Sequence, residues 1–287
     1  MNNYKLICID LDGTLLPSNH LVSERTKKTL KKAEELGIHI AISTGRSLTD
    51  AEHFAQLLGV KATVISANGA YVREKDSNEV VYKNILGEEA IWTIYDICNK
   101  YEVTPCYHTP DKIIHGPDYG RFLLQIEEKS RELGKKVIIT KPYPVENLEQ
   151  WKQFVEQEKD NILKCELFHE DTDRINNIKF DLRQLDQLEV VDSIREEHME
   201  ANSKGTSKGR AIEVLAGLLN IKREEIIAIG DGDNDITMIE FAGLGIAMGN
   251  AKEVLKAKAS YITGSNDEDG VAAAIEKFVL KKDKAII

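Results

Sequence analysis

The chain has 287 residues, enough for one large domain or two modest ones, and its 42% hydrophobic and 30% charged residues are ordinary for a globular protein. The formal net charge is −10, which argues against nucleic acid or an anionic membrane surface as the main partner. No apolar run approaches the length of a membrane span, and no basic leader precedes an apolar segment. We therefore expect a cytoplasmic protein.

Short apolar runs alternate with helical patterns at both ends of the chain. The expected strands are residues 6–9, 38–43, 63–66, 225–230, 244–248 and 260–263. Between them, apolar residues recur near the helical period at 25–37, 47–59, 208–220 and 234–243. Strands that alternate with helices predict βαβ units, and hence a doubly wound, Rossmann-like α/β fold with a parallel sheet.

The middle of the chain, residues 85–195, lacks this alternation. It holds both tryptophans and most of the prolines, with helical patterns at 88–101 and 118–134 and short strand candidates at 103–109, 111–116, 164–168 and 177–182. We expect a core domain of residues 1–84 and 196–287, interrupted by an inserted αβ cap domain of residues 85–195. The final residues, 281–287, are expected to form a loose tail.

The four cysteines are Cys8, Cys98, Cys106 and Cys165, and none of them forms a CxxC pair. A chain of this length does not need disulfides for stability, so reduced thiols are expected. Cys8 lies within the first expected strand, where a buried and inert thiol is favoured over a redox-sensitive one.

A first motif, Asp10-Leu11-Asp12-Gly13-Thr14, follows the expected strand 6–9. Two aspartates at the end of a strand can simply cap a helix or shape a turn. A second motif, Ile42-Ser43-Thr44-Gly45-Arg46, also follows an apolar run and precedes a helix. A hydroxyl and free N–H groups at such a turn suit a phosphate oxygen, although Ser/Thr-Gly is also common turn chemistry.

A third motif, Thr206-Ser207-Lys208-Gly209, opens a helical pattern. A lysine in the first turn lies at the positive end of the helix dipole, and a bound anion would resolve this mismatch. An ordinary solvated lysine is the alternative, and Lys204 is a rival for the same role.

A fourth motif, Gly230-Asp231-Gly232-Asp233-Asn234-Asp235, follows the expected strand 225–230. Three aspartates within five residues supply the hard oxygen ligands that suit Mg²⁺. An EF-hand calcium loop would need glycine at its sixth position and an acid at its twelfth, and here those are Ile236 and Ala242. The calcium interpretation is therefore excluded.

The placement of the motifs joins them into one site. Three stand at the carboxyl ends of expected strands, and Lys208 begins a helix on the same sheet; ligands of open α/β sheets bind at that edge. The aspartates would repel one another in a partly buried cleft, and a divalent cation resolves that repulsion. Asp10 can then attack a phosphoryl group to form an aspartyl-phosphate, while Asp12 transfers the proton.

In this order, DLDGT, STGR, TSKG and GDGDND resemble the four motifs of the haloacid dehalogenase superfamily of phosphatases. The segments NGAYV, GIAMGNA and TGSNDEDGVAAAIEKF are similar to its Cof-type subfamily, whose members carry a large αβ cap after the second motif. The resemblance implies a Mg²⁺-dependent phosphatase in which Asp10 is nucleophile and metal ligand. Asp12 would be the acid–base group, with its backbone carbonyl on the metal.

The resemblance also implies roles for the remaining motif residues. Phosphate would be bound by Thr44 and by the amides of Leu11 and Gly45, and it would be neutralised by Lys208. The fourth motif would supply the metal ligand Asp231, the directly or water-bound Asp235 and the phosphate contact Asn234. Arg46 is either a substrate contact or a structural ion-pair partner.

The leading interpretation is a phosphatase that hydrolyses small phosphorylated metabolites, such as sugar phosphates, under a cap that selects the substrate. We expect a monomer or a small homo-oligomer. One alternative is a phosphotransferase, such as a hexose phosphomutase. The other is a non-catalytic module that binds phosphorylated metabolites, although binding alone would not need the second carboxylate, Asp12.

Overall fold

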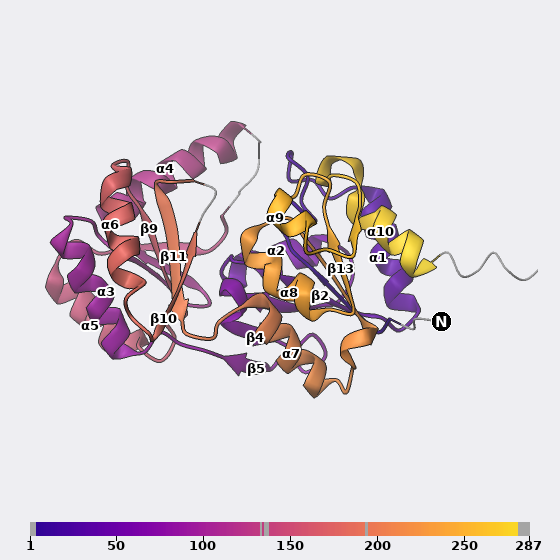
Figure 1. The fold of residues 1–287 in the computed structure, drawn as a ribbon. Helices are drawn as coiled ribbons and strands as arrows, with labels where there is room; N and C mark the ends of the chain where they lie inside the picture. Colours follow the sequence, from indigo (N-terminus) through magenta and orange to yellow (C-terminus); the bar gives the residue numbers. More distant parts are fainter. Residues whose placement is uncertain (1–3, 133, 135–137, 193–194, 281–287) are drawn as a thin grey trace, which may run out of the picture. The chain divides into compact units, whose positions relative to one another are not determined.

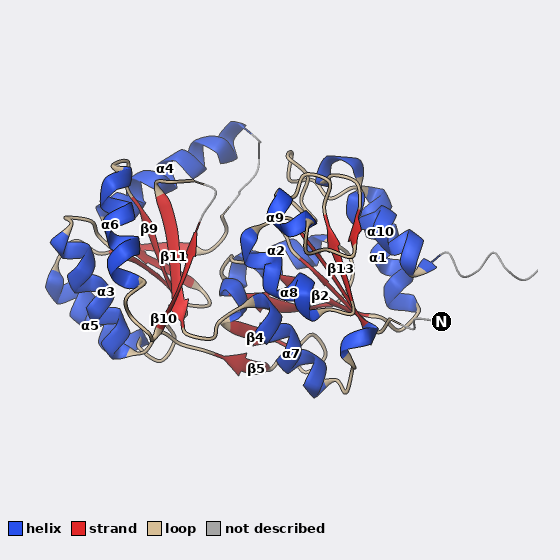
Figure 2. Ribbon diagram, viewed as in Figure 1, coloured by secondary structure: helices blue, strands red, loops and turns tan. Residues whose placement is uncertain are grey.

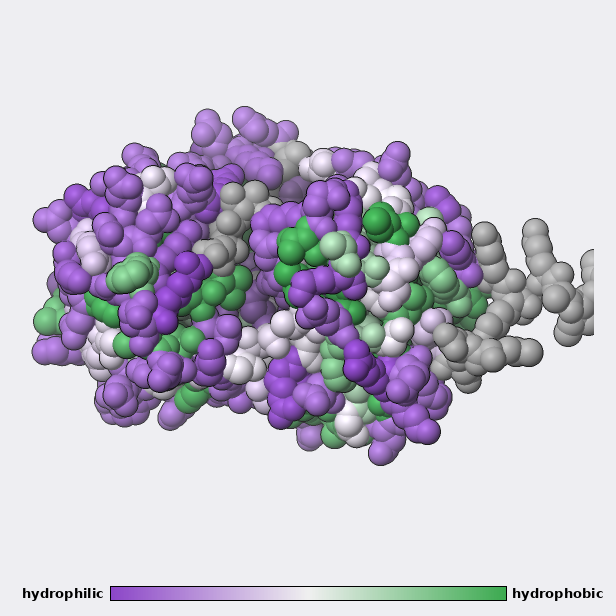
Figure 3. Space-filling model, viewed as in Figure 1, coloured by the Kyte–Doolittle hydropathy of each residue, from purple (hydrophilic) through white to green (hydrophobic). Residues whose placement is uncertain are grey.

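The computed structural model describes residues 4–132, 134, 138–192 and 195–280, and it divides into two compact units (Figure 1). The first unit comprises Met1–Arg46, Ala51–Tyr82 and Ser207–Ile287, and the second comprises Ser47–Asp50 and Lys83–Thr206. The expected tail, 281–287, lies outside the described residues. No helix among the described residues is long and apolar enough to cross a membrane. The face shown in Figure 3 is mostly hydrophilic, with smaller hydrophobic patches.

The first unit is built on an eight-stranded sheet of order β14-β13-β12-β1-β2-β3-β4-β5. Its strands are β1 (Leu6–Ile9), β2 (His39–Ser43), β3 (Ala62–Ser66), β4 (Tyr71–Arg73), β5 (Val80–Lys83), β12 (Ile226–Gly230), β13 (Leu244–Ala247) and β14 (Tyr261–Ile262). The strands from β14 to β3 are parallel, and β4 joins β3 antiparallel. The predicted parallel sheet is confirmed, and its six strands fall where the apolar runs placed them.

Helices cover both faces of this sheet (Figure 2). They are α1 (Glu24–Glu35), α2 (Leu48–Leu57), α7 (Lys208–Leu218), α8 (Ile236–Phe241), α9 (Glu253–Lys256) and α10 (Gly270–Phe278), with short 3₁₀ helices at Ala67–Gly69, Arg223–Glu225, Asp233–Asp235 and Asn266–Glu268. In the sheet, β2 lies beside β1 on the side away from β12, and β13 lies beside β12 on the side away from β1. Because crossovers between parallel strands are right-handed as a rule, these opposite directions place α1 and α8 on opposite faces of the sheet. The central strand β1 is buried along its whole length, which explains its unbroken apolar sequence.

The second unit has a six-stranded sheet of order β10-β11-β9-β6-β7-β8, antiparallel except where β7 meets β8. Its strands are β6 (Cys106–His108), β7 (Lys112–His115), β8 (Lys141–Pro144), β9 (Lys164–Phe168), β10 (Leu188–Asp192) and β11 (His198–Ser203). Its helices are α3 (Glu88–Lys100), α4 (Pro117–Glu132), α5 (Leu148–Glu158) and α6 (Thr172–Leu182). Residues of α3, α5 and α6 form one buried cluster with Tyr107, Cys165 and Met199 of the sheet.

Two expectations for the middle of the chain are corrected. Residues 177–182, predicted as a strand, belong to α6, because Asp171 caps that helix and Ile175, Ile178 and Leu182 are buried at helical spacing. The second unit also extends past the predicted boundary at residue 195. Strand β11 pairs with β9 and β10, and residues 196–206 belong to the second unit.

A buried charge network lies on the sheet of the second unit. The side chain of Lys164 is only 2% exposed, and its ammonium contacts Glu166 at 3.1 Å and also Glu200. The Nε2 atoms of His108 and His198 lie 2.9 and 2.6 Å from the carboxylate oxygens of Glu166. Burial raises the pKa of Glu166, but Lys164 and the two histidines outweigh it and hold that pKa well below its ordinary value.

A lowered pKa in the folded state means that Glu166 stabilises the fold above its unfolded pKa of about 4.5 and loses that contribution as the pH falls. At pH 7, we expect Glu166→Gln to lower the free energy of unfolding by about 3 kcal/mol, because it breaks a buried ion pair. The difference from wild type should narrow as the pH falls below about 5 and through the lowered pKa of Glu166. Urea unfolding, followed by the fluorescence of Trp92 and Trp151 in the second unit, measures this difference in the free energy of unfolding. A difference that does not change with pH would contradict this account.

Candidate active site

Three carboxylates and one ammonium meet where β1 and β12 end. Asp10 follows β1, and Asp231 and Asp235 lie in the loop after β12. The wholly buried Nζ of Lys208 lies 2.6 Å from an oxygen of Asp10 and 2.6 Å from an oxygen of Asp235. One oxygen from each of the three aspartates lies within 4.8 Å of the other two. A single ammonium therefore bridges two buried carboxylates beside a third.

Local packing explains how Lys208 reaches this position. Ser207 caps α7 by accepting the N–H of Arg210, so Lys208 is the first helical residue. The next residue, Gly209, packs against α8 so closely that a Cβ there would lie 2.5 Å from the carbonyl oxygen of Thr237. The absence of a side chain at this position lets α7 approach α8 and brings the lysine to the sheet edge.

The rival lysine, Lys204, has an exposed side chain. Lys204 belongs to the second unit, where 64% of its side chain is exposed and its ammonium lies 3.5 Å from Glu189. Burial and contact with two carboxylates distinguish Lys208 from this surface lysine. Of the two candidate lysines, Lys208 is therefore the one that contacts Asp10 and Asp235.

Hydrogen bonds fix the loop of the fourth motif against the first. One oxygen of Asp235 accepts the N–H groups of Asp231 and Gly232, each at 2.8 Å. The hydroxyl of Thr14 donates to Asp231 at 2.7 Å. Gly13 has a φ of +80°, and a Cβ there would lie 2.3 Å from a carboxylate oxygen of Asp231. Only glycine fits this position, because both the backbone angle and the close approach exclude a side chain.

The site carries more negative than positive charge. The pKa of Asp10 is raised well above its ordinary value. Burial is the largest cause and the Asp235 carboxylate the second, and together they outweigh the opposing effect of Lys208. Burial and Asp235 also raise the pKa of Asp231 to about 6, against the hydrogen bond from Thr14. Burial lowers the pKa of Lys208, but its two carboxylate partners outweigh that effect and raise it. The charge imbalance is what an additional cation would relieve.

Asp12 and Arg46 form an ion pair with two contacts. The Nε and Nη2 atoms of Arg46 each lie 2.7 Å from a carboxylate oxygen of Asp12, whose side chain is 46% exposed. The guanidinium also lies 4.7 Å from the ring centre of Phe54. Partial burial raises the pKa of Asp12, but Arg46 lowers it by more, so the carboxyl is ionised. Of the two roles predicted for Arg46, the structure shows the ion pair.

The phosphate-binding candidates line the turns after three strands. Leu11 follows Asp10 after β1, and Thr44 and Gly45 follow β2. Thr44 is buried, and its hydroxyl accepts the N–H of Arg46 at 3.2 Å. Asn234 lies in the loop after β12, where its side-chain amide donates to the side-chain oxygen Oδ1 of Asn68 at 3.1 Å.

Asn68 is a neighbour of the site that lies outside the four sequence motifs. It is the second residue after β3 and begins the segment NGAYV, which resembles the Cof-type subfamily. The available signal was an Asn-Gly pair at the end of an apolar run, which is also a common turn sequence. Cys8, in contrast, is wholly buried, and burial raises the pKa of its thiol, which stays un-ionised.

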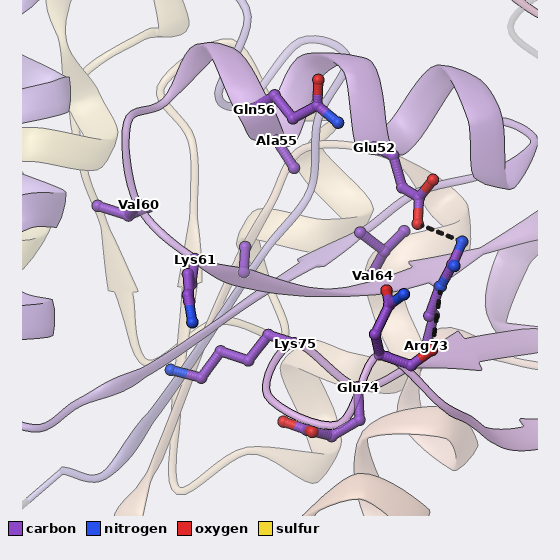
Figure 4. A pocket seen from close by; sticks show the side chains of 11 residues that line it. Glu52, Ala55, Gln56, Val60, Lys61, Val64, Arg73, Glu74 and Lys75 are labelled. Atoms are coloured by element: carbon purple, nitrogen blue, oxygen red, sulfur yellow. Dashed lines mark hydrogen bonds and ion pairs between the residues drawn. The ribbon is translucent and has the colours of Figure 1, made fainter.

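A cavity of about 340 Å³ lies elsewhere in the first unit, beside α2, the start of β3 and the loop after β4 (Figure 4). An ion pair of 2.8 Å between Arg73 and Glu52 forms part of its wall, together with the side chains of Lys61 and Lys75. The predicted site residues do not line this cavity. It lies by the amino end of β3, whereas the carboxylates lie past the carboxyl ends of β1 and β12.

Comparisons with known proteins agree with the four motifs. Residues 7–275 match the family described as haloacid dehalogenase-like hydrolase. The chain is 33% identical over 276 residues to the 5-amino-6-(5-phospho-D-ribitylamino)uracil phosphatase YcsE of Bacillus subtilis, with 96% of each chain covered.

Solved structures agree as well. A haloacid dehalogenase-like hydrolase from B. subtilis superposes with a TM-score of 0.83 at 29% identity, over 96% of this chain and 100% of that one. The subclass IIB sugar phosphatase BT4131 superposes with a TM-score of 0.77 at 28% identity, over 96% and 98% of the two chains. The family match covers residues 7–275, and the sequence identity to YcsE extends over 96% of this chain. The chain therefore belongs to the haloacid dehalogenase-like hydrolases of the Cof type.

Proposed function

We propose that this protein is a Mg²⁺-dependent phosphatase that hydrolyses small phosphorylated metabolites through an aspartyl-phosphate on Asp10. The observation that carries the proposal is the buried Asp10 carboxylate, held 2.6 Å from the ammonium of Lys208, with the exposed carboxyl of Asp12 two residues away. The chain is similar to the sugar phosphatase BT4131 and to YcsE, whose substrate carries a phosphorylated ribityl group. These similarities support sugar phosphates or similar monoesters as the substrate class.

The carboxylate cluster fits a divalent cation. Its ligand atoms are carboxylate oxygens, the type that Mg²⁺ prefers, and three acids face one ammonium. Asp10, Asp231 and the backbone carbonyl of Asp12 would hold the ion, with Asp235 beside them or joined through water. When bound, Mg²⁺ supplies the positive charge that neutralises phosphoryl oxygens.

The chain's own groups provide the steps of the reaction. A carboxylate oxygen of Asp10 attacks phosphorus, and the bond from phosphorus to the leaving oxygen breaks as Asp12 gives that oxygen a proton. Asp12 then takes a proton from the water that hydrolyses the aspartyl-phosphate. Lys208, Thr44 and the N–H groups after β1 and β2 hold the phosphoryl oxygens, with Asn234 on another side.

The ion pair with Arg46 bears on how Asp12 acquires its proton. In this pair the pKa of Asp12 is lowered, which favours the carboxylate over the acid. Moving the guanidinium onto an anionic substrate would remove that effect, so the pKa of Asp12 would rise towards the value of an ordinary carboxyl. We propose that substrate binding and the protonation of Asp12 are linked through Arg46.

The function is tested by the release of inorganic phosphate from a panel of phosphate monoesters, with Mg²⁺ and with an excess of chelator. We expect release from sugar phosphates and related monoesters that stops in chelator and returns when Mg²⁺ is restored. Conversion of a sugar phosphate to an isomer without free phosphate would instead identify a phosphomutase. Phosphate binding without any turnover would identify a non-catalytic binding module.

Asp10→Asn should abolish turnover, because an amide is a poor nucleophile of nearly the same shape. We expect kcat to fall at least about 1,000-fold with little change in Tm. Asp233→Asn is the matched control, since Asp233 lies in the fourth motif but pairs with Lys252. Activity of Asp10→Asn within a few-fold of wild type would rule out Asp10 as the nucleophile.

Lys208→Met should lower kcat/KM at least about 100-fold, because it removes the buried positive charge beside the reacting carboxylate. It should also lower the free energy of unfolding by about 3 kcal/mol, since two buried carboxylates lose their partner. Lys204→Met, on the exposed lysine, should change neither quantity. Steady-state kinetics and urea unfolding of both variants make the comparison, and equal losses in the two would reject the assigned role of Lys208.

A further inference from the structure

Residues 67–69 form a left-handed turn directly after β3. The φ angles of Ala67, Asn68 and Gly69 are +49°, +59° and +100°. Glycine adopts such angles freely and asparagine does so at moderate cost, whereas alanine does so rarely. All three residues are buried, and backbone strain of this kind persists only where the surroundings impose it.

The backbone of the turn is attached to the second motif. The N–H of Asn68 donates to the carbonyl of Thr44 at 3.0 Å, and the N–H of Ala67 donates to the carbonyl of Arg46 at 2.8 Å. Two consecutive strained residues are therefore held by hydrogen bonds to the segment that carries the phosphate-binding candidates of β2.

The far end of the turn presses against the third motif. A Cβ on Gly69 would lie 2.3 Å from the carbonyl oxygen of Ser207 and 3.1 Å from the backbone nitrogen of Lys208. The turn thus lies between the end of β2 and the start of α7. Its hydrogen bonds to Thr44 and Arg46 and its close contact with Ser207 fix its backbone on both sides.

The side chain of Asn68 reaches the fourth motif. It is 3% exposed, and its carbonyl oxygen accepts one N–H of the Asn234 amide at 3.1 Å. Asn234 is only partly buried, and its second amide N–H has no acceptor within the described residues. Since the amide is planar, fixing one N–H on Asn68 also fixes the direction of the other.

We propose that Asn68 is a positioning residue for phosphate binding, which holds the Asn234 amide so that its remaining N–H meets a phosphoryl oxygen. The inference rests on the proposed function, in which Asn234 contacts phosphate. Asn68 acts through Asn234 and does not itself touch the substrate. The left-handed backbone at Ala67 and Asn68 sets the direction of the Asn68 side chain, whose oxygen accepts the N–H of Asn234.

Asn68→Gly tests this role, because glycine keeps the left-handed backbone and removes only the side-chain amide. We expect kcat/KM to fall about 10-fold, mainly through a higher KM, with a matching loss in the affinity for inorganic phosphate measured by calorimetry in the presence of Mg²⁺. Ala67→Gly is the matched control, since it relieves the same kind of strain in the neighbouring residue. It should leave both quantities within about twofold of wild type.

A double-mutant cycle with Asn234→Ala separates positioning from a general structural effect. If Asn68 acts through Asn234, Asn68→Gly should cost less than about twofold in the Asn234→Ala background. The proposal is overturned if Asn68→Gly costs the same in both backgrounds, costs nothing, or is matched by Ala67→Gly. A wild-type protein that releases no phosphate refutes the proposed function instead, and the calorimetric phosphate affinities of the same variants still decide the role of Asn68.

Discussion

The buried ammonium of Lys208, shared at 2.6 Å between Asp10 and Asp235, is the interaction on which the site depends. An unpaired ion in this environment would cost several kcal/mol, so the lysine and its carboxylates can be buried only together. These two ion pairs connect the end of β1 to the start of α7 and to the loop after β12. Two glycines, Gly209 and Gly69, permit the close backbone approaches that bring α7 to this point.

The same cluster is incompletely neutralised, and this explains its chemistry. Each carboxylate is satisfied by loop N–H groups, a hydroxyl or the lysine, yet the pKa values of Asp10 and Asp231 remain raised. The protein thus maintains an excess of negative charge that a cation can relieve. Asp12 differs, because its charge is matched by Arg46 at the surface of the site. Two aspartates separated by a single residue therefore occupy opposite electrostatic environments.

Much of this arrangement follows from the sequence for a simple reason. The six parallel strands are apolar runs that the sequence shows directly. Residues that follow parallel strands all lie at the carboxyl ends of the sheet, whatever the length or sequence of the segments between the strands. Contacts between side chains do not follow in this way. The pairs Arg46–Asp12 and Asn234–Asn68 join residues 34 and 166 positions apart, and each depends on how loops pack after the sheet has formed. The second unit was harder to predict because its antiparallel strands are short and take their place from their partners, as β11 does from β9.

The connectivity of the sheets has a consequence for the order in which a newly made chain folds. The residues that form the six-stranded sheet all lie between Cys106 and Ser203, so that sheet can close on its own. In the other sheet, β1 is flanked by β12, and Leu6 pairs with Ile226. A chain growing on the ribosome therefore completes the inserted unit while β1 still lacks one of its neighbours. Asp10 gains the partners that control its charge only when the last third of the sequence emerges, so an incomplete chain carries no assembled site.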